Sequence, residues 1–114
     1  MPAKADYEGR MIVHLRKCFP HECGRLSDLE IRQAIDLGIA NAGKYGLVTE
    51  RDVCLYIDLM FVFGLDFDTS PNFPWASDIL NDSWRTDPSR KIDFLYDTAL
   101  MTTKKQAQDD VERG

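Results

Sequence analysis

The stretch Tyr45–Leu80 constrains the fold of this chain more than any other part of the sequence. It contains an apolar run, Val53–Leu65, interrupted by a single aspartate, and on a helix this run spreads apolar side chains over nearly every face. Thr49 supplies an N-cap for that helix and Gly64 a stop. A helix that is apolar on most sides lies at the centre of its domain, so we expect the rest of the chain to pack around it.

A capping box predicts the start of a second helix. In Ser27–Glu30 (SDLE), the serine hydroxyl accepts a hydrogen bond from the glutamate amide, and the glutamate carboxylate accepts one from the serine amide. Ala34, Gly38 and Ala42 follow at four-residue intervals and form a ridge of small side chains, which would let another helix approach closely. Gly43 is expected to end this helix in the left-handed conformation.

Three more helical segments complete the predicted secondary structure. They cover Ala5–Cys18, Trp75–Leu80 with Pro74 as its first residue, and Asp87 to about Thr102. The pair Phe19-Pro20 is expected to end the first of them. Within that segment, Met11–Leu15 also fits a short strand.

We therefore expect an all-α fold, a compact single-domain bundle of four to five helices with a short helix after an acidic loop. The domain would cover residues 1–103, and the polar residues 104–114 would form a frayed C-terminal tail. A length of 114 residues also favours one domain.

Charge and hydropathy exclude several classes of function. The net charge is −5, and residues 65–114 carry six Lys and Arg against ten Asp and Glu. Without a cluster of basic residues, nucleic-acid binding is not expected. No apolar run is long enough to span a bilayer, so no membrane partner is expected either. Cys18, Cys23 and Cys54 make an odd count, and the N-terminal residues lack the apolar core of a secretory signal, so we expect a cytoplasmic protein with free thiols.

The segment Cys18–Cys23 (CFPHEC) invites a zinc interpretation, because it combines two thiols with His21. Zinc needs three or four ligands, and closed sites usually show paired short spacings. His14 and Cys54 could add donors, but no second C-x-x-C is present. The structural alternative is favoured, in which Cys18 and Cys54 pack as small hydrophobes and His21 lies in a turn. No metal and no cofactor is therefore predicted.

Other chemical motifs are incomplete. Asp66–Ser70 (DFDTS) resembles the opening of a calcium loop, but Pro71 and Ser77 stand where such a loop needs Gly and Glu. Neither histidine lies beside a Gly-flanked serine or cysteine elbow, and there is no Gly-rich phosphate loop. No catalytic residue is predicted, and the chain is not expected to be an enzyme.

The acidic loop and the short helix after it form the predicted docking surface. From Asp52 through Trp84 the chain carries six aspartates and no Lys, Arg or His. The loop aspartates either cap turns and stay solvated or contact a basic partner. The aromatic residues around Pro74 either staple the helix start to the core or form an exposed anchor. The predicted partner-binding residues are Asp66, Asp68, Phe73 and Trp75.

Five segments together resemble a family of small bacterial helical proteins that are often encoded beside spike-tip and adaptor genes of type VI secretion clusters. The segments are RMIVHLRKCFP (Arg10–Pro20), YG (Tyr45–Gly46), ERDVCLYIDLMFVFG (Glu50–Gly64), DFD (Asp66–Asp68) and PWASDIL (Pro74–Leu80). The likeness covers about Tyr7 to Leu100. Members of the family usually carry a longer leader before the RM-x-x-HLR segment, so part of an N-terminal interaction element is expected to be missing here.

The resemblance implies a cytoplasmic bacterial protein associated with a toxin-delivery system, whose partner is an effector or a spike component. It carries no enzymatic signature. The first hypothesis is a non-enzymatic accessory factor, an adaptor or chaperone. The alternatives are an immunity protein that neutralises a cognate effector and, with less support, a small effector or enzyme.

Overall fold

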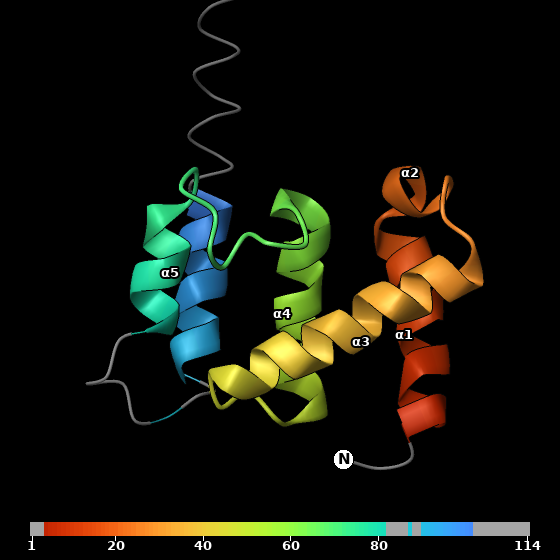
Figure 1. Cartoon of the computed structure of the whole chain (residues 1–114), viewed down its shortest axis with the longest axis horizontal. Coiled ribbons are helices and arrows are strands. Elements are labelled where there is room, and N and C mark those ends of the chain that lie inside the picture. The colour runs from red at the N-terminus through yellow and green to blue at the C-terminus, as the bar shows by residue number, and fades with distance from the viewer. Residues whose placement is uncertain (1–3, 82–86, 88–89, 102–114) are drawn as a thin grey trace, which may run out of the picture.

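In the computed structural model, which describes residues 4–81, 87 and 90–101, every regular element is a helix. The helices are α1 (Lys4–Cys18), α2 (Pro20–Cys23), α3 (Asp28–Lys44), α4 (Glu50–Phe63), α5 (Pro74–Leu80) and a further one over residues 90–101, the C-terminal helix (Figure 1). The predicted all-α bundle is confirmed. Among these helices, none has both the length and the apolar character needed to cross a membrane.

The single-turn helix α2 was not predicted. Pro20 is its first residue, where the missing N–H of proline removes no helical hydrogen bond. The amide of Cys23 donates to the carbonyl of Phe19 at 2.9 Å, and the amide of Gly24 donates to the carbonyl of Pro20, also at 2.9 Å. The prediction that Phe19-Pro20 ends the first helix is correct for α1, but His21 lies in this extra turn of helix rather than in a turn without helix.

Both ends of α3 are set by local hydrogen bonds. At its start the Ser27 hydroxyl accepts from the Glu30 amide at 3.2 Å, and the Ser27 amide donates to the Glu30 carboxylate at 3.1 Å, so the capping box is confirmed. The predicted stop at Gly43 is wrong, because α3 continues through Lys44. Gly46 instead takes the positive φ of 81°. The amide of Leu47 then closes back on Ala42, as in the Schellman ending that favours glycine at this position.

Helix α3 lies across α4 (Figure 1), and the two helices pack closely at Gly38. A Cβ atom at Gly38 would lie 2.5 Å from Cγ1 of Ile57 and 3.0 Å from the sulfur of Met60. Ala34 and Ala42, one turn away on either side, are buried as well. The predicted small-residue ridge is therefore the surface on which α3 meets α4.

The predicted central position of α4 is confirmed by its burial. The turns of α4 contribute a larger set of buried apolar side chains than any other helix among the described residues, namely Val53, Tyr56, Ile57, Leu59 and Met60. Its N-cap is Thr49, whose hydroxyl accepts from the Asp52 amide at 3.2 Å. Because α4 is covered on several sides, a contact made to it is a contact to the middle of the domain.

The C-terminal helix is joined to the rest of the domain by a buried lysine. Lys91 is 9% exposed, and its ammonium group donates to the carbonyl of Tyr45 at 3.2 Å and to the carbonyl of Leu80 at 3.1 Å. Arg51 of α4 also pairs with Asp93. Ile92 and Leu95 are fully buried, so this helix is an integral part of the core rather than an appendage.

Gly38→Ala should lower the free energy of unfolding by about 1–3 kcal/mol, because the added methyl must displace Ile57 or Met60. Gly43→Ala is the matched control on the same helix, since nothing lies within 4 Å of a Cβ at that position. There the better helix propensity of alanine should raise stability by up to about 1 kcal/mol. Urea unfolding followed by circular dichroism measures both. Equal stability of the two variants would show that α3 and α4 do not meet closely at Gly38.

Ser27→Ala should cost about 1 kcal/mol, because the Glu30 amide loses its hydrogen-bond acceptor at the start of α3. Ser27→Asp should keep most of the stability, since aspartate is an equally good N-cap. The same unfolding experiment compares them. A loss as large with aspartate as with alanine would mean that the serine acts through packing and not through the cap.

Candidate functional site

The acidic loop predicted to dock a partner is partly folded inward. Phe67 is fully buried, and its ring lies 5.2 Å from that of Tyr56. Asp68 is only 7% exposed and accepts a 2.7 Å hydrogen bond from the Tyr45 hydroxyl. Burial and this hydrogen bond raise the pKa of Tyr45 to about 12. The expectation that both loop aspartates stay solvated is therefore wrong for Asp68, whereas Asp66 is exposed.

The two aromatic residues around Pro74 pack against the end of α4. The ring of Phe73 lies 4.9 Å from that of Phe63, and the ring of Trp75 lies 5.5 Å from it in an edge-on arrangement. Both side chains are half-buried. This is the staple alternative, in which the aromatic residues fix the start of α5 on the core. Of the four predicted partner-binding residues, Asp66 is exposed, Phe73 and Trp75 are half-buried and Asp68 is buried.

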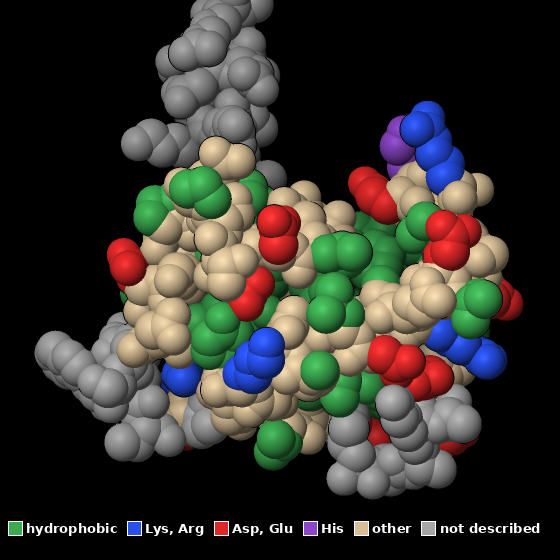
Figure 2. All heavy atoms as spheres, in the orientation of Figure 1, with side chains coloured by type: hydrophobic (Ala, Val, Ile, Leu, Met, Phe, Trp, Pro, Cys, Tyr) green, Lys and Arg blue, Asp and Glu red, His purple; other side chains and the backbone are tan. Residues whose placement is uncertain are grey.

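A groove lies between α3 and the C-terminal end of α4, with a volume of about 470 Å³. Figure 2 shows it as an apolar recess beside the α2–α3 side of the molecule, with acidic side chains next to it. The buried Ala34 and Met60 form its base. The charged residues that line it are Glu22 and Glu30, both exposed. Its other lining side chains are mainly apolar, including Leu26, Leu37, Phe61 and Leu65.

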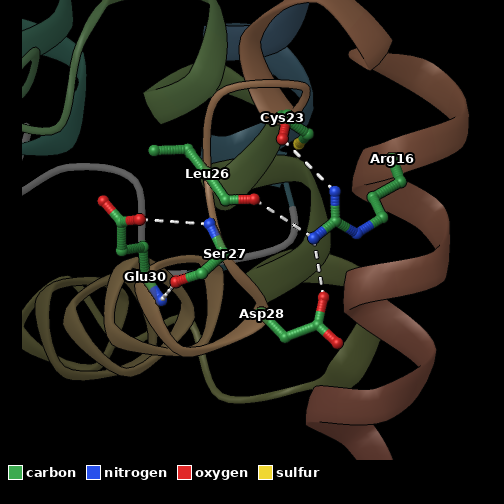
Figure 3. A network of polar contacts seen from close by, with 6 residues as sticks. All are labelled: Arg16, Cys23, Leu26, Ser27, Asp28 and Glu30. Atoms are coloured by element: carbon green, nitrogen blue, oxygen red, sulfur yellow. Dashed lines mark hydrogen bonds and ion pairs between the residues drawn. The ribbon is translucent and has the colours of Figure 1, made fainter.

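Arg16 of α1 holds the α2–α3 connection that forms one end of this groove (Figure 3). Its guanidinium donates at 3.2 Å to the carbonyls of Cys23 and Leu26 and pairs with Asp28 at 2.6 Å. Because the planar guanidinium presents several donors in fixed directions, one side chain satisfies two turn carbonyls and the first residue of α3 together. Leu26 is thereby held at the groove.

A second site of convergent side chains lies between α1 and α4. His14 and Cys18 stand one turn apart on α1, and Cys54 and Asp58 stand one turn apart on α4, so each pair shares a helix face. Nε2 of His14 lies 2.9 Å from a carboxylate oxygen of Asp58 and 3.7 Å from the sulfur of Cys54. Nδ1 of His14 lies 3.7 Å from the sulfur of Cys18. We call these four residues the His14 cluster.

Burial disfavours negative charge in the His14 cluster. The pKa of Cys54 is raised to about 11, first by burial and then by the nearby Asp58 and Cys18. Burial also raises the pKa of Asp58, although the hydrogen bond from His14 lowers it in part. A catalytic cysteine needs the opposite shift, because the thiolate is the nucleophile. The cluster is thus a poor nucleophilic centre without a further positive charge.

The zinc interpretation of the sequence names Cys18, His14 and Cys54 as possible metal donors, but it does not include Asp58 and does not place the four side chains together. That interpretation starts from the CFPHEC segment, but Cys23 is buried away from the cluster and its carbonyl accepts a hydrogen bond from Arg16. The signal that could have found the cluster is the pair of one-turn spacings, H-x-x-x-C on one helix and C-x-x-x-D on another. The expectation that Cys18 packs as a small hydrophobe is wrong, because this thiol is exposed.

Comparison of the chain with family models, curated proteins and solved structures finds no match.

The three thiols should differ in their rate of alkylation by iodoacetamide. Cys18 is exposed and should react first, whereas Cys54 should react much more slowly at pH 7–8 because its pKa of about 11 leaves very little thiolate. Cys23 is 1% exposed, and burial raises its pKa, so it should be protected until the protein unfolds. Peptide mass spectrometry over time gives the three rates. Equal rates for Cys18 and Cys54 in metal-free protein would contradict the placement of Cys54 between α1 and α4.

Proposed function

We propose that the protein is a non-enzymatic accessory factor, an adaptor or chaperone, that binds an effector or spike component of a type VI-like toxin-delivery system in the bacterial cytoplasm. The observation that supports it is the apolar groove between α3 and α4, with Glu22 and Glu30 in its lining. The family resemblance implies the kind of partner, and we assign the groove as the surface that binds it.

The groove has the composition of a helix-binding surface. Leu37 and Leu65 remain 41% and 48% exposed along it, over a base that Met60 and Ala34 close. Apolar side chains that stay in contact with water gain free energy when a partner covers them, at about 25 cal/mol per Å². Grooves of this kind take the apolar face of an amphipathic helix, whose anchors recur every three or four residues. We therefore assign an amphipathic helix of the partner as the occupant.

The charges select a basic helix. Glu22 and Glu30 line one end of the groove, and the exposed Asp66 follows directly after the lining residue Leu65. The chain as a whole carries a net charge of −5. Lys or Arg residues flanking the apolar anchors of the partner helix would meet these carboxylates. Such rim charges act mainly on the rate of association and on the choice of partner. The predicted role of Asp66 thus fits the rim of this groove.

Leu37→Arg should weaken binding of the protein encoded beside this chain, effector or spike component, by about tenfold or more, because it places a charge in the apolar centre of the interface. Leu29→Arg is the matched control, since Leu29 lies on the same helix, is 66% exposed and does not line the groove. Isothermal titration calorimetry with the purified partner measures both. Equal affinities for Leu37→Arg and the wild type would remove the groove from the interface.

A charge-reversal variant tests the choice of partner separately. Glu22→Lys should slow association and reduce its dependence on salt, whereas Asp97→Lys on the exposed side of the C-terminal helix should not.

Co-expression with a toxic effector distinguishes the adaptor from an immunity protein. Rescue of the cells by this protein would support the immunity protein, which neutralises the toxin, and would contradict the adaptor.

A further inference from the structure

We propose that His14, Cys54 and Asp58 bind one divalent transition-metal ion of the zinc class, and that Cys18 orients the His14 ring for this purpose. The three donor atoms come from two helices and lie within 4.8 Å of one another. They are the imidazole nitrogen, the thiol sulfur and a carboxylate oxygen, which together are typical ligands of zinc.

Two of the three distances between the donor atoms are close to those that a tetrahedral ion requires, and the third, from the Cys54 sulfur to the Asp58 carboxylate, is at most 4.8 Å. Zinc–ligand bonds of about 2.3 Å to sulfur and about 2.0 Å to nitrogen or oxygen imply edges of about 3.6 Å between N and S and about 3.3 Å between N and O. The observed distance from His14 Nε2 to the sulfur of Cys54 is 3.7 Å. That from Nε2 to the Asp58 oxygen is 2.9 Å, a hydrogen bond that has to open by only a few tenths of an ångström. The two distances from His14 therefore need only small side-chain rotations to match a bound ion.

The mixture of donors selects the class of ion. Calcium and magnesium take oxygen ligands almost exclusively, so a site with an imidazole and a thiol does not suit them. Zinc and its neighbours among the divalent transition metals bind nitrogen, sulfur and oxygen together. With three protein ligands, the fourth position of the ion is left for solvent. The side chain of His14 is 35% exposed and provides that access.

Cys18 has a different role, because it lies on the other side of the imidazole ring. Its sulfur is 3.7 Å from Nδ1 of His14, the nitrogen that does not face Asp58 and Cys54. When Nε2 binds a metal ion its lone pair is used, so Nδ1 carries the proton and donates it toward the sulfur. Partners of this kind fix the tautomer and the orientation of a metal-binding histidine.

Cys54 and Asp58 stand one turn apart on α4 and bring a thiol and a carboxylate to one partly buried position beside His14. A divalent ion bound there would stabilise both groups as anions, and the thiol proton would leave to solvent. An open hollow of about 290 Å³ lined by His14 and Cys54 gives the ion a way in. The arginines beside it, Arg10 and Arg51, are paired with Glu50 and with Asp93.

The bound ion would join α1 to the central helix α4. Residues 14 and 58 are 44 positions apart, so the ion would close a long loop of chain between them. Anything that binds the folded state and not the unfolded state stabilises the fold. The proposed metal is therefore a clamp on the position of α1, which also carries Arg16 toward the groove.

The test uses the purified full chain, freed of metal and titrated with Co²⁺ alone and then with Zn²⁺. We expect one equivalent of Co²⁺ to give the visible bands of a tetrahedral site and a thiolate charge-transfer band, and Zn²⁺ to displace it. Zn²⁺ at about 100-fold excess over Kd should raise the melting temperature by about 10 °C. Absence of one-equivalent binding at micromolar metal would overturn the proposal.

Variants of similar size assign the ligands. Cys54→Ser should abolish the charge-transfer band, and His14→Gln and Asp58→Asn should each weaken binding at least tenfold. Cys18→Ser should keep the band with affinity reduced about tenfold, as for other orienting partners. His21→Gln and Cys23→Ala change a histidine and a thiol outside the cluster, so they should leave the charge-transfer band and the metal affinity unchanged. Circular dichroism confirms that each variant is folded. Retention of full affinity by the Cys54 and His14 variants, or loss of the band with Cys18→Ser alone, would overturn the assignment.

Discussion

The close approach of α3 and α4 at Gly38 is the constraint on which the rest of the structure depends. A side chain of even one carbon at this position would overlap Ile57, so the separation of the two helices is set by the absence of a Cβ atom. Small residues on one helix let the side chains of the other fill the space between the backbones. The base of the groove, made by Ala34 and Met60, lies on the same contact. The shape of the proposed binding surface is therefore a product of core packing.

Features encoded by neighbouring residues were predictable. The capping box at Ser27, the N-cap at Thr49 and the small-residue ridge on α3 each follow from residue types at fixed short spacings, and each is present in the structure. The central position of α4 followed from its apolar circumference. Such signals need no knowledge of which segment meets which, because they are complete within one or two turns of helix.

The predictions that failed share a physical cause. In each case the local sequence fits two structures equally well, and contacts with distant residues decide between them. Gly43 lies in the last turn of α3 and Gly46 lies just beyond its end, so either glycine could have ended the helix. Gly46 takes the positive φ, and the next residue, Leu47, is 1% exposed and donates its amide back to Ala42. Asp68 has the sequence context of an ordinary loop aspartate, and its hydrogen bond comes from Tyr45, which lies 23 residues earlier in the chain. The His14 cluster forms because one face of α1 is turned toward one face of α4. This relative orientation of two helices cannot be read from local sequence patterns.

The contacts of Lys91 bear on how the protein forms while it is being synthesised. Its ammonium group donates to the carbonyl at the end of α3 and to the carbonyl at the end of α5, which precede it by 46 and 11 residues. Until this lysine has left the ribosome, both carbonyls lack their final donor, and the side of the core that Ile92 and Leu95 cover stays open to water. Nascent chains generally fold from the N-terminus onward, but here the last described helix completes the interior. A stalled or shortened product would thus expose apolar surface, which is what chaperones and proteases of the cell recognise.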